Sequence, residues 1–305
     1  MNYNNLYLLD VSPFVHAGRV NKYARFEKLV EEDVTWKTQV TPAGGISLIF
    51  NTLYNICGTG DIIACCDSNP TIKKDMFEGY KATRTHKPEV EINKQVAEYI
   101  LRACNVTTVS MPGYEADDII YTYIKTLHNL YDKIYIYTAD SDLYFLVDDK
   151  VEIRPSSSQA KAITKETFEK TVIHGAKWHY NTITIDKVIN GDSSDNIPPL
   201  QAGLREIAQD IFFSSKINYE HYGDKEFCML YADGYPDIQE RINLIWPLVV
   251  EGIPTDISTP DMQAIKNWGD AMHNKLFKGK MSPSFNVEEE VDAMQSLGMY
   301  LDDVI

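Results

Sequence analysis

The stretch GYEADDIIYTYIKTLHNLYDKIYIYTADSD, residues 113–142, organises the rest of the chain. Three acidic residues stand where an apolar helix begins, and two more follow an apolar strand. They are Glu115, Asp117, Asp118, Asp140 and Asp142. With no basic residue inside either group, these carboxylates would repel one another if the fold brought them together. A divalent cation removes that repulsion, and oxygen ligands favour magnesium or manganese. We therefore expect a magnesium-dependent enzyme.

Two earlier apolar segments also end in aspartate, and both are predicted to be buried strands. Residues 6–10 end at Asp10, and residues 61–67 end at Asp67. Strands alternate with helical patterns up to about residue 175, which predicts an α/β fold with a mostly parallel central sheet and helices on both faces. Ligands bind such sheets at the carboxyl ends of the strands, so these aspartates are expected at one edge. Residues 23–34 are expected to be helical.

Composition excludes several classes of protein. The chain has 305 residues and no apolar run of about 18, so no membrane-spanning segment is expected. Its N-terminus lacks the basic and apolar parts of a secretory signal. The five cysteines form no C-x-x-C pair and are expected to be reduced. We therefore expect a cytoplasmic protein without a membrane partner.

The formal net charge of −15 is atypical of a nucleic-acid-binding protein, but one local segment is basic. Residues 68–88 hold Lys73, Lys74, Tyr80, Lys81, Arg84, His86 and Lys87 against only two acidic residues, Asp75 and Glu78. An aromatic ring beside two cations, as in Tyr80, Lys81 and Arg84, suits a nucleotide. The alternative interpretation is a solvated loop.

A further acidic pair, Asp192 and Asp195, lies in the segment NGDSSDNI at residues 190–197. It does not match a calcium loop, because Ile197 occupies the glycine position and Gly203 the terminal glutamate position. The alternative is a helix-capping turn rich in Asp and Asn. Acidic residues at a helix N-terminus have a comparable alternative, since they favour the helix dipole without any further role.

Taken in order, these motifs resemble the 5′ nuclease family: flap endonucleases, the 5′–3′ exonuclease domain of bacterial DNA polymerase I, and phage 5′ exonucleases. The segments that carry the resemblance are the strand ends at Asp10 and Asp67, and residues 77–84, 113–118, 138–142 and 190–197. The chain looks most similar to phage enzymes, including the ribonuclease H of T-even phages. The resemblance implies a PIN-like nuclease core at 1–183, with a helical arch at about 73–98 over a single 5′ strand. A helical C-terminal region would follow at 184–305.

The resemblance also implies roles for the acidic residues. Two magnesium ions are expected, with manganese as a substitute. One ion would be held by Asp10, Asp67, Asp117 and Asp140, with Glu115 acting directly or through water. The second ion would lie nearer Asp142, Asp192 and Asp195. Asp118 is included among the candidate ligands.

The basic residues take the other roles that the resemblance implies. Lys81 and Arg84 would hold the scissile phosphate, and Tyr80 would stack on the neighbouring nucleotide. The candidate catalytic residues are Lys81, Arg84, Asp10 and Asp67. Further nucleic-acid contacts are expected from Lys73, Lys74, Lys87 and Arg205.

One segment departs from the family pattern. A glycine-rich helix–hairpin–helix turn that binds duplex DNA and potassium usually follows the last aspartates, whereas here residues 197–205 read IPPLQAGLR. The expected element is therefore degenerate, and its potassium site lacks most of the glycines. The apolar and acidic tail at 294–305 is a candidate docking segment for a sliding clamp or single-strand-binding protein, with an ordinary terminal helix as the alternative.

The sequence thus predicts a monomeric, magnesium-dependent 5′–3′ exonuclease or flap endonuclease. Its substrates would be DNA flaps or RNA–DNA hybrids, with removal of RNA primers in phage DNA replication as its role. Two alternatives stay open. A PIN-type single-strand ribonuclease would need only the acidic cluster, and a non-catalytic nucleic-acid-binding module would have the fold without holding metal.

Overall fold

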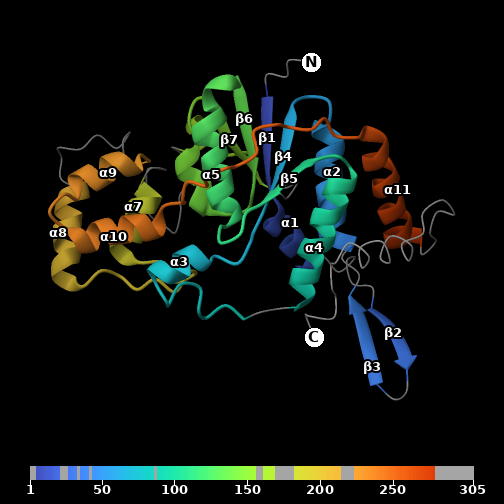
Figure 1. Cartoon of the computed structure of the whole chain (residues 1–305), viewed down its shortest axis with the longest axis horizontal. Helices are drawn as coiled ribbons and strands as arrows, with labels where there is room; N and C mark the ends of the chain where they lie inside the picture. The colour runs from blue at the N-terminus through green and yellow to red at the C-terminus, as the bar shows by residue number, and fades with distance from the viewer. Residues whose placement is uncertain are drawn as a thin grey trace.

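A five-stranded parallel sheet forms the centre of the protein, with the order β5-β4-β1-β6-β7 (Figure 1). The computed structural model describes residues 5–20, 27–32, 35–40, 43–85, 88–155, 161–168, 182–213 and 223–278. The strands are β1 (Asn5–Asp10), β4 (Asp61–Cys66), β5 (Thr107–Ser110), β6 (Lys133–Tyr137) and β7 (Val151–Arg154). The predicted fold class is confirmed, because helices cover both faces of this sheet.

The central strand β1 shows why the sheet is covered on both sides. Its alternate residues Leu6 and Leu8 pack with α5 (Ala116–Leu127), whereas Tyr7 and Leu9 pack with α1 (Val11–Val20), α2 (Ala43–Ile56) and α4 (Pro88–Ala103). Both leucines on the α5 side are fully buried. Burying such a side chain contributes about 1.5–3 kcal/mol, so the apolar run of β1 places Asp10 at the carboxyl end of a stable central strand.

The helix predicted at residues 23–34 is wrong where the structure describes it. Strands β2 (Glu27–Glu32) and β3 (Thr35–Val40) pair there as an antiparallel hairpin. The sequence of β3 alternates β-branched and aromatic residues with polar ones, a pattern that favours strand pairing. Pairing with this neighbour overrode the local helical pattern of the preceding segment.

A second group of helices packs around its own apolar cluster. It comprises α7 (Thr182–Asn190), α8 (Ala202–Phe213), α9 (Lys225–Tyr231) and α10 (Pro236–Ile245). Trp246 and Phe212 are fully buried in its centre. Phe145 of the 3-10 helix η3 (Ser141–Leu146) and Tyr121 of α5 join the same cluster, which fastens this group to the sheet layer. Figure 1 shows these helices at the left, opposite α2 and α4.

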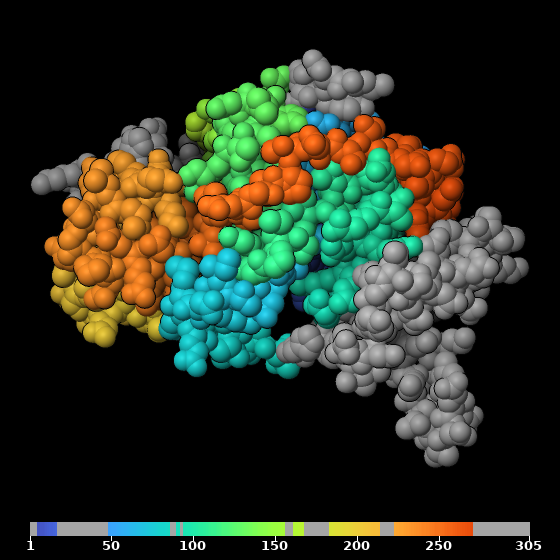
Figure 2. Space-filling model, viewed as in Figure 1, coloured from blue at the N-terminus to red at the C-terminus, as the bar shows by residue number. Residues whose placement is uncertain are grey.

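The chain then returns to the layer of the central sheet. Residues 247–261 cross the surface of α5 toward α11 (Met262–Lys278), as the orange band in Figure 2 shows. The Tyr123 hydroxyl donates to the Pro254 carbonyl at 2.6 Å along this path. In α11, Ile265 and Trp268 pack into the cluster of α1, α2 and α4. Within the described part of the predicted helical region at 184–305, α11 therefore packs with the core helices, whereas α7 to α10 pack around their own cluster.

The predicted arch at about 73–98 consists of two helices in the described part of the chain. The helix α3 (Thr71–Met76) is followed by turns at 78–83, and α4 begins at Pro88. The remaining short elements are η2 (His128–Leu130) and α6 (Lys165–Phe168). Within the described residues, no helix is long and apolar enough to span a membrane.

Candidate active site

Four aspartates predicted to share one metal ion meet at the carboxyl edge of the sheet, and we call them the first acidic group. Asp10 ends β1, Asp67 follows β4, Asp117 lies in the first turn of α5, and Asp140 follows β6. Burial raises the pKa of Asp10 well above its usual value, and the charges of Asp67 and Asp140 raise it further. The pKa of Asp117 is raised by burial and then by Asp10 and Asp140. These carboxylates therefore repel one another, and a bound cation would offset that repulsion.

The N-terminus of α5 faces this group of aspartates. The Ala116 N–H donates to Asp67 Oδ1 at 2.9 Å, and Lys94 of α4 donates to Asp67 Oδ2 at 3.0 Å. Burial alone would raise the pKa of Asp67, but Lys94 and a hydrogen bond from Ser12 lower it to about 2. The helix dipole also favours negative charge at this end. Asp67 is therefore held ionised and in place.

Thr138 orients the two neighbouring aspartates of this group. Its hydroxyl donates to Asp10 Oδ2 at 2.8 Å and accepts from the Asp140 N–H at 3.0 Å. Asp140 in turn caps η3, since its Oδ1 accepts the Asp142 N–H at 2.9 Å. One buried threonine thus links the ends of β1 and β6.

The candidate ligand role of Asp118 is contradicted by its surroundings. Its side chain is fully buried, and Oδ2 accepts the Glu115 N–H at 2.9 Å as half of a capping box. Its Oδ1 accepts the Leu248 N–H at 2.7 Å and lies 3.4 Å from Lys73 Nζ. Both oxygens are therefore occupied within the protein. Adjacent helix positions point in different directions, so Asp117 faces the site while Asp118 faces the core.

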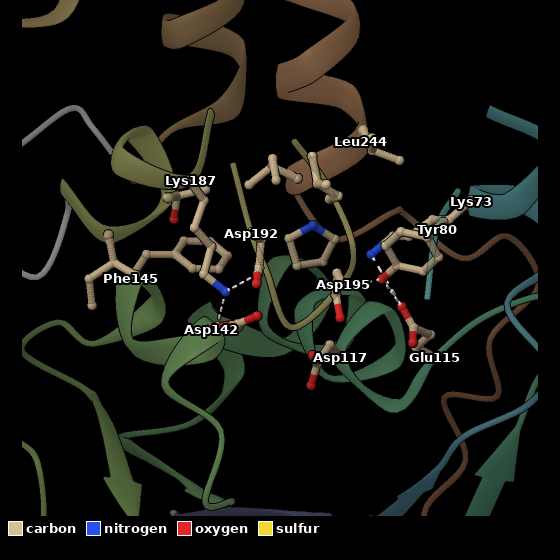
Figure 3. A pocket seen from close by; sticks show the side chains of 15 residues that line it. Lys73, Tyr80, Glu115, Asp117, Asp142, Phe145, Lys187, Asp192, Asp195 and Leu244 are labelled. Atoms are coloured by element: carbon tan, nitrogen blue, oxygen red, sulfur yellow. Dashed lines mark hydrogen bonds and ion pairs between the residues drawn. The ribbon is translucent and has the colours of Figure 1, made fainter. Parts of the chain in front are cut away.

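A second acidic group lies beside the first. Asp142, Asp192 and Asp195 present oxygens that all lie within 4.8 Å of one another. These three residues and Asp117 line a small cavity of about 30 Å³ (Figure 3). That volume is sufficient for a water molecule or a single ion. The structure thus brings together residues about 50 positions apart in the sequence, as the resemblance implied.

Asp192 also makes the capping-type turn that was its alternative interpretation. Its Oδ1 accepts the Ser194 N–H at 2.8 Å, and its backbone exchanges two hydrogen bonds of 2.8 Å with Ile197. Its Oδ2 points to the acidic group. The two interpretations of Asp192 are therefore compatible, because the turn that uses its Oδ1 directs its Oδ2 toward the acidic group.

Gly191 permits this turn, and its replacement is expected to destabilise the second acidic group. The residue has φ of +76°, and an added Cβ would lie 2.4 Å from the Ile197 carbonyl oxygen. Gly191→Ala should lower the free energy of unfolding by about 1–3 kcal/mol, measurable by urea denaturation. Gly252→Ala, which has a similar φ of +70° and open space around it, is the matched control. Equal losses in the two variants would contradict a specific clash at Gly191.

Two cations of the segment after α3 contact Glu115 and the second acidic group. Lys81 has φ of +54°, and its Nζ donates to Glu115 while lying 3.6 Å from Asp195 Oδ1. Arg84 Nη2 donates to the same Asp195 oxygen at 2.8 Å. Burial alone would raise the pKa of Glu115, but Lys81 and Lys73 lower it. A non-glycine residue with positive φ at such a position indicates a constrained, functional backbone.

Lys73 is not available to nucleic acid, which corrects its predicted role. It is 5% exposed, and its Nζ lies 3.6 Å from Glu115 Oε2 and 3.4 Å from Asp118 Oδ1. The apolar packing of α3 turns this lysine inward, whereas its neighbour Lys74 stays at the surface. Lys73 is therefore an internal counter-ion for the start of α5.

The predicted stacking role of Tyr80 is also contradicted. The residue is 2% exposed, and its hydroxyl donates to Glu115 Oε2 at 2.6 Å and approaches Asp195 Oδ2 at 3.1 Å (Figure 3). The ammonium groups of Lys73 and Lys81 lie 5.7 and 5.0 Å from its ring centroid. Tyr80 therefore positions two carboxylates and two cations, with its ring closed to a nucleotide.

Tyr80→Phe separates these two roles for the tyrosine. Phenylalanine keeps a ring that could stack but loses the hydroxyl, whose hydrogen bond to Glu115 is worth about 1.5–3 kcal/mol because the acceptor is charged. We expect turnover to fall about tenfold or more while the Michaelis constant for a nucleic-acid substrate stays within about twofold. Steady-state kinetics measure both. Unchanged turnover with Phe and a raised Michaelis constant with Leu would restore the stacking role.

An open cleft of about 610 Å³ lies next to the first acidic group. The end of β4, α3, the turn at 80–85 and α4 contribute its lining. Its cations are Lys74, Lys81, Arg84 and Lys94, and its acidic residues are Asp67, Glu91 and Glu115. A cleft lined by both cations and carboxylates fits a phosphate group whose counter-ions bridge to the carboxylates.

Several predicted residues lie away from this cleft or cannot be placed. Lys87 and the tail at 294–305 fall outside the described residues. Arg205 is half-buried in α8, and its Nη2 donates to the Leu200 carbonyl at 3.3 Å. Around the stretch predicted to be a degenerate helix–hairpin–helix element, the structure has α7 and α8, with residues 191–201 between them.

Sequence reasoning missed several side chains that contact the carboxylates, among them Thr138, Lys94 and Lys187. Lys187 of α7 donates to both Asp142 and Asp192. None of them stands in a short motif with its partner, except that Thr138 lies two residues before Asp140. The lysines are brought into the site by helix packing and carry no local signal.

The residues present fit divalent metal ions. All donors are carboxylate oxygens, which suit hard cations such as magnesium or manganese. Asp10 and Asp117 make no ion pair within the described residues, although both are crowded by other carboxylates. The first group is therefore short of positive charge in the protein alone.

Comparison with known proteins agrees with this geometry. The sequence model for the N-terminal resolvase-like domain of 5′–3′ exonucleases matches residues 6–173. DNA polymerase I of Rhizobium leguminosarum is 26% identical over 256 residues, which cover 79% of this chain and 23% of that protein. The thermostable DNA polymerase I of Thermus thermophilus is 33% identical over 133 residues, or 42% of this chain and 15% of that one. The chain thus corresponds to less than a third of these relatives.

A solved structure shares the fold. The bacteriophage T5 flap endonuclease, determined with DNA and metal ions, aligns with a TM-score of 0.50 at 16% identity. The alignment covers 79% of this chain and 97% of that one. With the family match spanning more than half of the sequence, the chain belongs to the 5′–3′ exonuclease family, through its N-terminal resolvase-like domain.

Proposed function

We propose that this protein is a magnesium-dependent, structure-specific 5′ nuclease that hydrolyses phosphodiester bonds in DNA flaps or RNA–DNA hybrids. The observation that carries the proposal is the pair of acidic groups at the sheet edge, opening beside a cleft lined by cations. The relatives' name, DNA polymerase I, supports a role in replication, and removal of RNA primers is the specific role proposed. The phage setting rests on the motif resemblance alone.

The two acidic groups would hold the two metal ions. Asp10, Asp67, Asp117 and Asp140 would hold the first, and the group around Asp192 the second. Magnesium supplies two kinds of chemistry at such a site: it lowers the pKa of a bound water and it stabilises charge on the leaving oxygen. Manganese would substitute, because it takes similar oxygen ligands.

Lys81 and Arg84 would bind the scissile phosphate from the cleft. Both cations lie within 4 Å of Asp195 or Glu115, so each stands at the boundary between the cleft and the acidic groups. The hydrogen bond of 2.9 Å from the Lys81 N–H to the Asp195 carbonyl fixes the backbone that carries the first of them. Their roles are to orient the phosphate and to offset negative charge that grows during cleavage.

The nucleic-acid partner is proposed to be DNA with a 5′ flap. The T5 relative of the same fold was determined with DNA, and human GEN1 with a Holliday junction, which supports branched DNA as the substrate class. Lys74 on the cleft wall would add a backbone contact. Arg205 in α8 would contribute to duplex binding through the degenerate helix–hairpin–helix element.

Cleavage of a 5′-labelled flap duplex at low salt, with magnesium and with EDTA, tests the proposal. An RNA–DNA hybrid and a plain single strand run beside it. We expect magnesium-dependent cuts at or near the flap junction and no product with EDTA. Cutting of single-stranded RNA alone would favour the PIN-type ribonuclease. A folded protein that binds the flap and cuts nothing would be a binding module.

A further inference from the structure

Lys187 occupies a central place in the second acidic group. It reaches the group from α7, and its Nζ donates to Asp142 Oδ1 and Asp192 Oδ2 (Figure 3). These two aspartates belong to the three residues whose oxygens lie within 4.8 Å of one another. The ammonium group is therefore bound by the same oxygens that would coordinate a divalent ion.

The environment makes this ion pair a strong one. The side chain of Lys187 is 20% exposed, and that of Asp192 is 8% exposed. Charges so removed from water are screened little by salt and interact more strongly than surface pairs. The third residue, Asp195, already has Lys81 and Arg84 as partners. Within the described residues, each carboxylate of the second group thus contacts a cation, and Lys187 is shared by Asp142 and Asp192.

The first acidic group has fewer cation partners than the second. Lys94 pairs with Asp67, but no ion pair reaches Asp10, Asp117 or Asp140 within the described part of the chain. Negative charge is therefore in excess in the first group and largely balanced in the second. A divalent ion gains more by entering the first group, because Asp10, Asp117 and Asp140 have no ion-paired cation to give up within the described residues.

We propose that Lys187 is the resident counter-ion of the second group, and that a divalent ion binds there only by displacing its ammonium from Asp142 and Asp192. This proposal deepens the proposed function, since it assumes that the carboxylates bind metal. The lysine stays protonated throughout, so the event is an exchange of one cation for another. Its flexible four-carbon stem allows the ammonium to move into water. The protein should therefore fill its two metal sites at well-separated concentrations.

Metal binding without nucleic acid tests this proposal directly. Manganese is titrated into metal-free protein, and free manganese is followed by electron paramagnetic resonance. The variants are Lys187→Met, which keeps the length and removes the charge, and Lys187→Arg, which keeps the charge. Lys125→Met is the matched control, because Lys125 pairs with Glu226 at 2.9 Å on the surface.

For the unmodified protein we expect two classes of site whose dissociation constants differ at least tenfold. Lys187→Met should tighten the weaker class at least tenfold and leave the tighter class unchanged. Lys187→Arg and Lys125→Met should bind as the unmodified protein does. Without metal, the Met variant should also melt at a lower temperature, and manganese should restore its melting temperature.

Other outcomes distinguish failure of the Lys187 proposal from failure of the proposed metal-dependent function. If the Met variant binds manganese no better than the unmodified protein, or more weakly, Lys187 is a structural link and the proposal fails. If the unmodified protein binds no manganese at all, the proposed metal-dependent function fails first. Should the Met variant not fold, Lys187→Gln provides the same comparison with a polar, uncharged side chain.

Discussion

Asp140→Asn is expected to reduce cleavage of a flap substrate by about a thousandfold or more, equivalent to about 4 kcal/mol of transition-state stabilisation. The substitution removes one charge from the group formed with Asp10 and Asp117, so the affinity for a divalent ion falls. Asparagine keeps the capping oxygen that accepts the Asp142 N–H, so the fold should be unaffected. Single-turnover cleavage at saturating magnesium measures the loss.

The design separates loss of function from loss of fold. Asp149→Asn is the matched control, because the Asp149 side chain is 85% exposed and pairs with Lys165 at the surface. Both variants should melt within about 2 °C of the unmodified protein when magnesium is absent. Full activity of Asp140→Asn would show that Asp140 is not a metal ligand and that the first group has three ligands.

Lys81→Ala is expected to slow the chemical step by about a hundredfold to a thousandfold, with a change in substrate binding of only a few-fold. A preorganised donor aimed at developing charge is worth about 2.7–4 kcal/mol in such sites. Lysine and alanine carry the same backbone penalty at φ of +54°, so the comparison isolates the ammonium group. Lys73 stays 3.6 Å from Glu115, which limits structural damage.

Lys74→Ala provides the contrast within the same cleft. Its Nζ donates to Asn69 Oδ1 at 2.7 Å at the exposed wall, away from the carboxylates. We expect it to weaken binding and reduce the salt dependence of affinity by about one counter-ion, with turnover unchanged. If Lys81→Ala behaved in this same way, Lys81 would be an anchor for the substrate rather than a contact to the transition state.

The two disagreements at Tyr80 and Asp118 have a common origin. Both residues stand in motifs where polarity predicts exposure, yet the packing of α3 and α5 encloses them. Tyr80 joins Ile197 and Leu244 in a small apolar cluster, which places its hydroxyl on Glu115 and Asp195. A motif shows which residue types are present, whereas the direction of each side chain depends on how the helices pack.

The sequence by itself determined the parallel sheet, the positions of its strands and the aspartates at their carboxyl ends. These features follow from local patterns, because an apolar run that ends in Asp is recognisable in the sequence without knowledge of its contacts in the fold. Only the tertiary structure decided which cation partners each carboxylate, that Tyr80 is enclosed, and that α11 returns to α2. Those outcomes depend on contacts between residues far apart in the chain. Lys94 reaches Asp67 and Lys187 reaches Asp142 through helix packing, for which no short stretch of sequence carries a signal.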